Sequence, residues 1–134
     1  MSLSAEGIAN VGKIMEEKLK AFIKSYGELN AKKEILNKIM EISSDKRDAA
    51  EYAELQVKIQ LIESCLQMLP KDERKIVSLH LIENLKWSEV AEQYEKQVGA
   101  ECNYSERSFK RIQKNALHRI KDFICKNQWE NYIE

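Results

Sequence analysis

The sequence contains few of the residues that make tight turns, with four glycines and one proline among 134 residues. Sandwiches, barrels and nucleotide-binding α/β folds need many such turns. The scarcity of glycine and proline therefore argues against these classes and favours an all-α fold. The length predicts one domain of ordinary size, or one domain with a helical extension.

Cysteine pairs and long apolar runs are also missing. Cys65, Cys102 and Cys125 are widely spaced and include no Cys-X-X-Cys pair, so we expect neither a disulfide framework nor a zinc knuckle. No stretch approaches the roughly 18 apolar residues of a membrane helix, and the start lacks the layout of a signal peptide. A reducing cytoplasm, with no membrane partner, is the expected location.

Motifs of the common enzyme classes are absent from the sequence. It has no phosphate-binding P-loop, no GxSxG nucleophile elbow and no HExxH zinc motif. His80 lies in an apolar helical segment, where a core imidazole is more frequent than a general base. Cys102 has no basic neighbour in the sequence that would activate its thiol. We therefore predict no enzyme, no catalytic residue, no metal and no cofactor.

The charged residues balance overall, with 22 basic and 22 acidic side chains, but their distribution is uneven. Between residues 105 and 121, six Lys and Arg residues stand against one acid, Glu106; the six are Arg107, Lys110, Arg111, Lys114, Arg119 and Lys121. This basic segment in a neutral protein points to an anionic partner.

Apolar residues that recur every three or four positions predict helices in the N-terminal half. One stripe runs over residues 8–26 and is interrupted at Gly27, and a second continues over 29–42 to a polar loop at 43–45. A third helix runs to Leu69, and its apolar residues have the a/d spacing of a helix packed along its length: Tyr52, Leu55, Ile59, Ile62, Leu66 and Leu69. Two partners are open for this face: the stripe of residues 8–26, or a second copy of the chain.

Pro70 marks a boundary, because proline cannot continue a helix but is tolerated in the first turn of the next one. A short apolar helix is expected over residues 71–83, followed by a turn at 84–86. A further helix starts at Trp87, with Ser88 accepting a hydrogen bond from the first-turn amides, and ends near Gln97. Its inward-facing residues are Val90, Ala91 and Tyr94.

A polar connection over residues 98–103 leads to Ser105, which is expected to cap a long final helix that ends near Asn127. The apolar stripe of this helix consists of Phe109, Ile112, Ala116, Leu117, Ile120, Phe123 and Ile124. The other face carries Arg107, Lys110, Arg111, Lys114, His118 and Lys121. A short helix, a connection and a longer cationic helix are typical of a helix-turn-helix, whose second helix enters the DNA major groove. A merely solvated basic face is the alternative interpretation.

Three segments, in this order, resemble region 4 of bacterial sigma factors. They are LPKDERKIV at residues 69–77, ENLKWSEVAE at 83–92 and YSERSFKRIQKNAL at 104–117, and the resemblance spans residues 69–123. It implies a helix-turn-helix that reads the −35 promoter element, with a recognition helix that starts at Ser105. The DNA contacts implied by the resemblance are Ser105, Glu106, Arg107, Ser108, Lys110, Arg111 and Lys114, with Trp87 and Ser88 where the first motif helix would approach the DNA backbone. A core position is the alternative interpretation of Trp87. His118 is a further candidate contact, because it lies on the same cationic face. Arg107 and Arg111 would contact bases or the adjoining phosphates, and Lys110 and Lys114 would contact phosphates.

Two features depart from the sigma-factor pattern. Thirteen residues separate Ala91 from Ser105, where sigma factors have about half as many. Residues 1–69 do not resemble the sigma region that melts the −10 element, since no basic, aromatic-rich helix is present. The combination resembles small phage or prophage transcriptional regulators of the ArpU and RinA kind.

These observations predict three parts: a helical hairpin or bundle at residues 1–69 for dimerisation or partner binding, a sigma region 4-like DNA-binding domain at 70–127, and a C-terminal tail at 128–134. The leading hypothesis is a sequence-specific transcription regulator of phage or prophage origin that binds double-stranded promoter DNA. RNA polymerase and a second copy of the chain are further expected partners, because one helix-turn-helix buries little surface. The competing hypothesis is a helical adaptor that binds RNA polymerase or a sigma factor without contacting DNA.

Overall fold

The computed structural model describes residues 5–43, 45–99 and 104–133, with side chains from Met15 onward. Helices α1 to α6 and two short helical segments account for nearly all of this part of the chain. Their bounds are α1 Ala5–Lys24, α2 Tyr26–Ile42, α3 Lys46–Met68, α4 Lys71–Val77, the π-helix η1 Ser78–Ile82, α5 Trp87–Val98, α6 Glu106–Lys126 and the 3-10 helix η2 Glu130–Ile133. The prediction of an all-α fold, with a helical hairpin before the helix-turn-helix, is confirmed.

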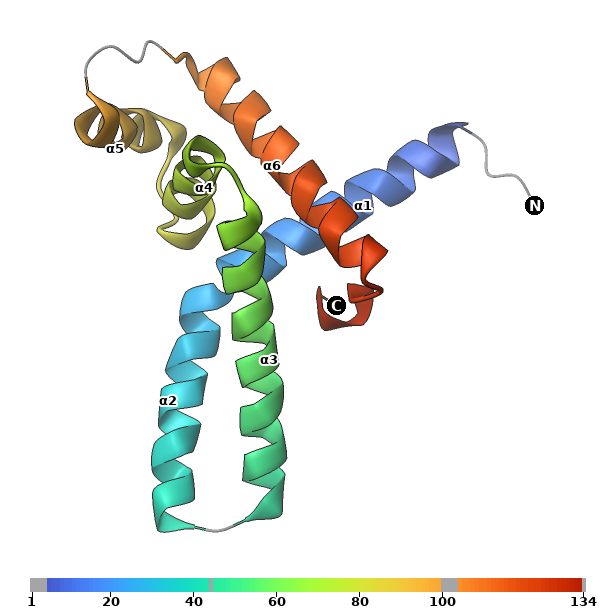
Figure 1. Ribbon diagram of the computed structural model, residues 1–134, viewed down its shortest axis with the longest axis vertical. Coiled ribbons are helices and arrows are strands. Elements are labelled where there is room, and N and C mark those ends of the chain that lie inside the picture. Colours follow the sequence, from blue (N-terminus) through green and yellow to red (C-terminus); the bar gives the residue numbers. More distant parts are fainter. Residues whose placement is uncertain (1–4, 44, 100–103, 134) are drawn as a thin grey trace.

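Helices α2 and α3 form an antiparallel hairpin that extends from the body of the molecule (Figure 1). The side chain of Asp45 accepts a hydrogen bond from the amide of Arg47 at 2.9 Å and so caps the start of α3. Leu55 and Ile59 of α3 belong to the same buried cluster as Leu29 and Leu36 of α2. Most of the a/d face of α3 is therefore used inside the monomer, and its principal partner is α2 rather than the stripe of residues 8–26.

The break between the first two helices falls at Ser25 and not, as the sequence indicated, at Gly27. The hydroxyl of Ser25 donates to the carbonyl of Phe22, and Gly27 lies inside the first turn of α2. The helical periodicity on both sides of the break is similar, so the sequence pattern alone does not distinguish these two positions. The part of the predicted stripe at residues 8–14 lies outside the described side chains.

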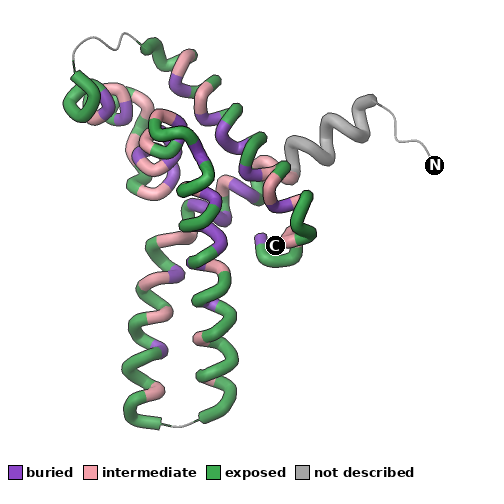
Figure 2. Tube along the Cα trace, in the orientation of Figure 1, coloured by how far each residue is buried: buried purple, intermediate pink, exposed green. Residues whose placement is uncertain are grey.

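Helix α1 crosses the body and contacts α6 and η1, so the two halves of the chain share one core. Leu19 and Ile23 of α1, each 1% exposed, lie in the same buried cluster as Ala116 and Ile120 of α6 and Ile62 of α3. Figure 2 shows the buried residues concentrated where these helices meet and thinning toward the tip of the hairpin. Because side chains from before and after residue 69 pack in one core, the position of α6 depends on that of α1.

The C-terminal residues fold back onto the body, although the sequence indicated only a tail at residues 128–134. Trp129 packs edge-to-face on Phe123 of α6, with ring centroids 5.5 Å apart, and Ile133 of η2 is buried. These contacts hold the end of α6 against the shared core.

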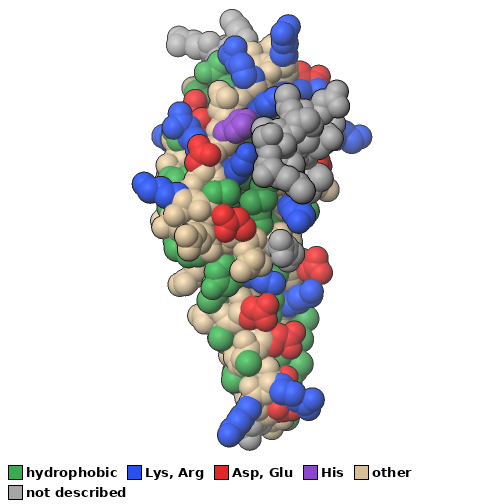
Figure 3. Space-filling model, turned by 90° about the vertical axis from the view of Figure 1, so that its right-hand side faces the viewer, with side chains coloured by type: hydrophobic (Ala, Val, Ile, Leu, Met, Phe, Trp, Pro, Cys, Tyr) green, Lys and Arg blue, Asp and Glu red, His purple; other side chains and the backbone are tan. Residues whose placement is uncertain are grey.

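The outer surface of the hairpin is mixed in character. Ile35, Ile39 and Ile42 form an exposed apolar stripe on α2, and Ile42 is 90% exposed. Acidic and basic side chains alternate along the hairpin on the face shown in Figure 3. No helix in the described part of the chain is long and apolar enough to cross a membrane.

Candidate nucleic-acid interface

A bend between α3 and α4 opens the helix-turn-helix region at Pro70, as predicted. The Arg74 guanidinium donates to the carbonyl oxygens of Leu66, Gln67 and Leu69 at 3.0, 3.0 and 3.1 Å. The Leu66 carbonyl also accepts from the Leu69 amide at 3.2 Å. The arginine thus caps the carbonyl end of α3, where a helix runs out of its own donors, and ties that end to α4.

The turn at residues 84–86 is also present, with Asn84 in the left-handed region at φ 57°. Asparagine tolerates this conformation better than most residues. The predicted cap of the next helix is wrong, because Lys86 occupies the N-cap of α5 and Ser88 lies within the first turn. The Glu89 carboxylate accepts a hydrogen bond from the Lys86 amide at 3.2 Å, so Glu89 supplies the capping interaction.

Helix α5 continues to Val98 and so takes up part of the long segment between Ala91 and Ser105. Gly99 ends the helix at φ 101°, a backbone conformation that side chains with a Cβ rarely adopt. Residues 100–103 of the predicted connection, including Cys102, lie outside the described part of the chain.

Three aromatic rings join α5 to the start of α6. Tyr94 packs on Phe109 with ring centroids 5.5 Å apart, and Tyr104 packs on the same two rings at 5.9 and 5.7 Å. Tyr94 and Phe109 belong to a second buried cluster with Ile76, Leu79 and Val90. This cluster sets the position of α6 relative to α5, and therefore which side of α6 is available to a partner.

The start of α6 agrees with the prediction. Ser105 is the N-cap, and its hydroxyl oxygen accepts a hydrogen bond from the Ser108 amide at 3.2 Å. The Ser108 hydroxyl lies 3.1 Å from that of Ser105 and is half-buried. The predicted apolar stripe of α6 faces the core. The polar residue Gln113 is also buried on this helix and is 4% exposed.

The opposite face of α6 is basic and exposed. Arg107, Lys110, Arg111, Lys114 and His118 are all exposed, and we call them the basic face. Glu106 forms an ion pair with Lys110 at 3.3 Å, one turn along the helix. Among the residues that the structure describes, no carboxylate lies within ion-pair distance of Arg107, Arg111 or Lys114. Three cations on one helix face therefore remain available for an anionic partner.

Trp87 and His80 connect the first helix of the motif to the second. The two rings are stacked with centroids 3.8 Å apart, and Nδ1 of His80 donates to Oε1 of Gln113 on α6 at 2.8 Å. Trp87 is half-buried, while Ser88 is exposed beside it. The stack and the hydrogen bond together place the start of α5 and the middle of α6 on the same edge of the molecule.

The surroundings of His80 favour its neutral form. Burial lowers the pKa of the imidazole below its usual 6.5, and the positive charges of Lys24, Lys20 and Lys110 lower it further. The hydrogen bond with Gln113 opposes this shift. The lowered pKa disfavours the charged imidazole, so His80 adds little to the positive charge that Lys20, Lys24 and Lys110 bring to this region.

Arg119 belongs to the basic segment of the sequence but has a structural partner. Its Nε donates to Oε1 of Glu73 at 3.3 Å, and Glu73 is 7% exposed. Oε2 of Glu73 has no hydrogen-bond partner among the described residues. Arg119 thus joins α6 to α4 and offsets a buried carboxylate, which separates it from the basic face.

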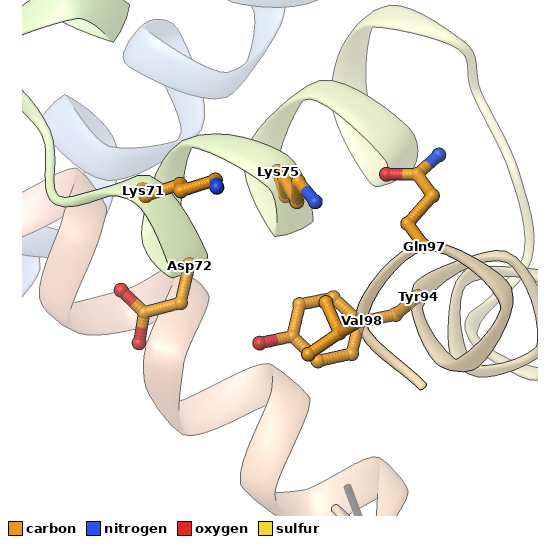
Figure 4. A pocket seen from close by; sticks show the side chains of 6 residues that line it. All are labelled: Lys71, Asp72, Lys75, Tyr94, Gln97 and Val98. Carbon is orange, nitrogen blue, oxygen red and sulfur yellow. The ribbon is translucent and has the colours of Figure 1, made fainter. Parts of the chain in front are cut away.

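A cleft of about 460 Å³ lies between α4 and α5 (Figure 4). Lys71, Asp72 and Lys75 line it from α4, and Tyr94, Gln97 and Val98 line it from α5. The described residues contain no group of three His, Cys, Asp or Glu side chains that could hold a metal ion. The cleft is lined by both positively and negatively charged side chains, whereas the charged side chains of the basic face are positive.

Comparison with protein families shows that residues 59–110 match the family described as Sigma-70, region 4. The matched segment begins in α3, includes α4, η1 and α5, and ends in the first turns of α6. It covers less than half of the chain. Comparisons with curated proteins and with solved structures found no match. The matched family indicates a DNA-binding, transcription-related role for this part of the protein.

The structure adds three residues to this region that the sequence did not indicate as part of a site. His80 connects α5 with α6, and Lys20 and Lys24 of α1 lie close enough to His80 to influence its pKa. No local pattern could have identified the two lysines, because they reach this edge through the packing of α1 against η1 and α6.

Proposed function

We propose that this protein is a sequence-specific transcription regulator whose helix α6 binds the major groove of double-stranded promoter DNA. The observation that carries the proposal is the basic face of α6, which is exposed, has three cations without a described acidic partner, and begins at a capped N-terminus. Arginine can fork onto guanine, and lysines and free amides at a helix N-terminus bind phosphates.

Within this proposal, Arg107 and Arg111 contact bases or the adjoining phosphates, and Lys110 and Lys114 contact phosphates. Ser105, Glu106, Ser108 and His118 lie on or beside the same face, and Trp87 and Ser88 approach the DNA backbone from the start of α5. The family match to residues 59–110 supports this assignment for α5 and for the start of α6 up to Lys110. Arg111, Lys114 and His118 lie beyond the matched segment, and their assignment rests on their exposure on the basic face.

The proposal also covers the origin of the protein and its binding partners. A phage or prophage origin rests on the resemblance to small regulators that join a helical half to a sigma region 4-like half. A second copy of the chain, or RNA polymerase, would add the contact area that a single helix-turn-helix lacks.

The salt dependence of DNA binding tests the proposal. If about five phosphates are neutralised, the logarithm of the association constant falls against log[salt] with a slope of roughly −4 to −5. Fluorescence anisotropy with a labelled random-sequence duplex, at about 50 and about 200 mM salt, measures this slope. A protein that circular dichroism shows to be folded, yet that binds no duplex at the lower salt, would contradict the proposal.

The second candidate function is an adaptor that binds RNA polymerase or a sigma factor without contacting DNA. The exposed stripe of Ile35, Ile39 and Ile42 on α2 favours it, because contiguous apolar surface is a common feature of protein interfaces. An apolar interface is far less sensitive to salt than phosphate binding, so the same titration separates the two functions.

A further inference from the structure

Helix α1 carries two lysines to the edge where the motif helices meet. Lys20 and Lys24 lie one turn apart, and the neighbouring Leu19 and Ile23 are each 1% exposed, so the rotation of α1 about its axis is fixed by the core. Helix α1 contacts both η1 and α6. The side of the molecule on which Lys20 and Lys24 lie is therefore set by the packing of α1 against the core.

His80 lies on η1, which packs against α1, and connects α5 with α6. It bonds to Gln113 of α6 and stacks on Trp87 at the start of α5. Lys110 of the basic face lies one turn before Gln113, and Lys24, Lys20 and Lys110 all act electrostatically on His80. Positive charges from α1 and α6 thus occupy the same edge of the molecule, beside the start of α5.

The two lysines of α1 differ in whether a nearby carboxylate offsets their positive charge. Lys20 forms ion pairs with Glu16 at 3.8 Å and Glu17 at 3.6 Å. For Lys24, which is exposed, no acidic partner lies within ion-pair distance among the described residues. An uncompensated cation near other cations destabilises the compact state slightly and raises the local positive potential.

We infer that Lys24, with Lys20 beside it, binds backbone phosphates of the same DNA duplex that α6 enters, so that α1 extends the DNA-binding surface beyond the matched segment. The inference rests on the proposed function. Lysine is suited to this role, because it acts as a point charge on a long stem and reads no sequence. The DNA contact surface would then include a helix that lies before residue 59 in the chain.

The test compares Lys24→Ala, Lys24→Arg and the control Lys38→Ala, which removes an exposed lysine of α2 on the hairpin. Duplex affinity and its salt slope are measured for each by fluorescence anisotropy. Lys24→Ala should weaken binding roughly three- to tenfold near 0.1 M salt and reduce the slope by about 1, while Lys24→Arg and Lys38→Ala leave both nearly unchanged. The double change Lys20→Ala/Lys24→Ala should weaken binding further.

Two results would overturn the inference, and they are distinguishable. If the wild type binds DNA but Lys24→Ala behaves like Lys38→Ala, the contribution of α1 is refuted and the proposed function stands. If the folded wild type binds no duplex, both fail. Thermal unfolding of each variant separates a DNA contact from a stabilising effect of Lys24 on the helix dipole, which would alter the melting temperature without altering the salt slope.

Discussion

Replacing Arg107 and Arg111 together by alanine should weaken duplex binding roughly 100-fold while leaving the fold intact. Both side chains are exposed and lie on the basic face of α6, and neither has an acidic partner among the described residues. Their removal costs no packing, and the proposal assigns them contacts with bases or adjoining phosphates. Fluorescence anisotropy with one labelled duplex at fixed low salt measures the loss.

The control for this pair removes the same charge elsewhere. Lys46→Ala/Arg47→Ala deletes two exposed cations at the start of α3, at the tip of the hairpin. If binding depended only on the net charge of the protein, both double variants would weaken it equally. Equal losses, or an unaltered affinity of Arg107→Ala/Arg111→Ala, would refute the position assigned to the recognition face.

Replacing Ile120 by alanine should lower the free energy of unfolding by about 2 to 5 kcal/mol. Ile120 is 0% exposed and lies in the cluster that α1, α3 and α6 share. Removing three carbon atoms there costs transfer free energy and leaves a cavity that the surrounding helices fill only partly. Urea unfolding, followed by circular dichroism, measures the change.

The matched control is Ile35→Ala, which makes the same chemical change at a residue 62% exposed on α2. It should alter stability by less than about 0.5 kcal/mol. Similar losses for the two variants would contradict the shared core, and with it the rigid placement of α6 against α1.

The features that the sequence predicted well depend on short-range signals. Ser105 and the stripe from Phe109 to Ile124 define α6, because a cap and a 3.6-residue period are both local. The exposure of the basic face follows from the same periodicity. Pro70 marked the boundary between α3 and α4 correctly for a similar reason, since its effect on the backbone is independent of tertiary contacts.

The wrong predictions concern either the exact residue at which a helix is capped or the choice of a packing partner elsewhere in the fold. Ser88 is a good capping residue, but α5 begins at Trp87 and its N-cap is Lys86, whose amide donates to the Glu89 carboxylate. The apolar face of α3 required a partner, and the two that the sequence left open, the stripe of residues 8–26 and a second copy of the chain, did not include α2, which is its principal partner in the structure. The position of Lys24 beside His80 depends on that tertiary choice and has no signal in the sequence.

The most direct test of the central claim maps the DNA-binding surface residue by residue. We would titrate ¹⁵N-labelled protein with a duplex and follow the backbone amide resonances. The account predicts the largest shifts at the exposed face of α6 and at the start of α5, with little change at the tip of the hairpin between α2 and α3. Shifts confined to the hairpin, with the resonances of residues 105–118 unmoved, would contradict it.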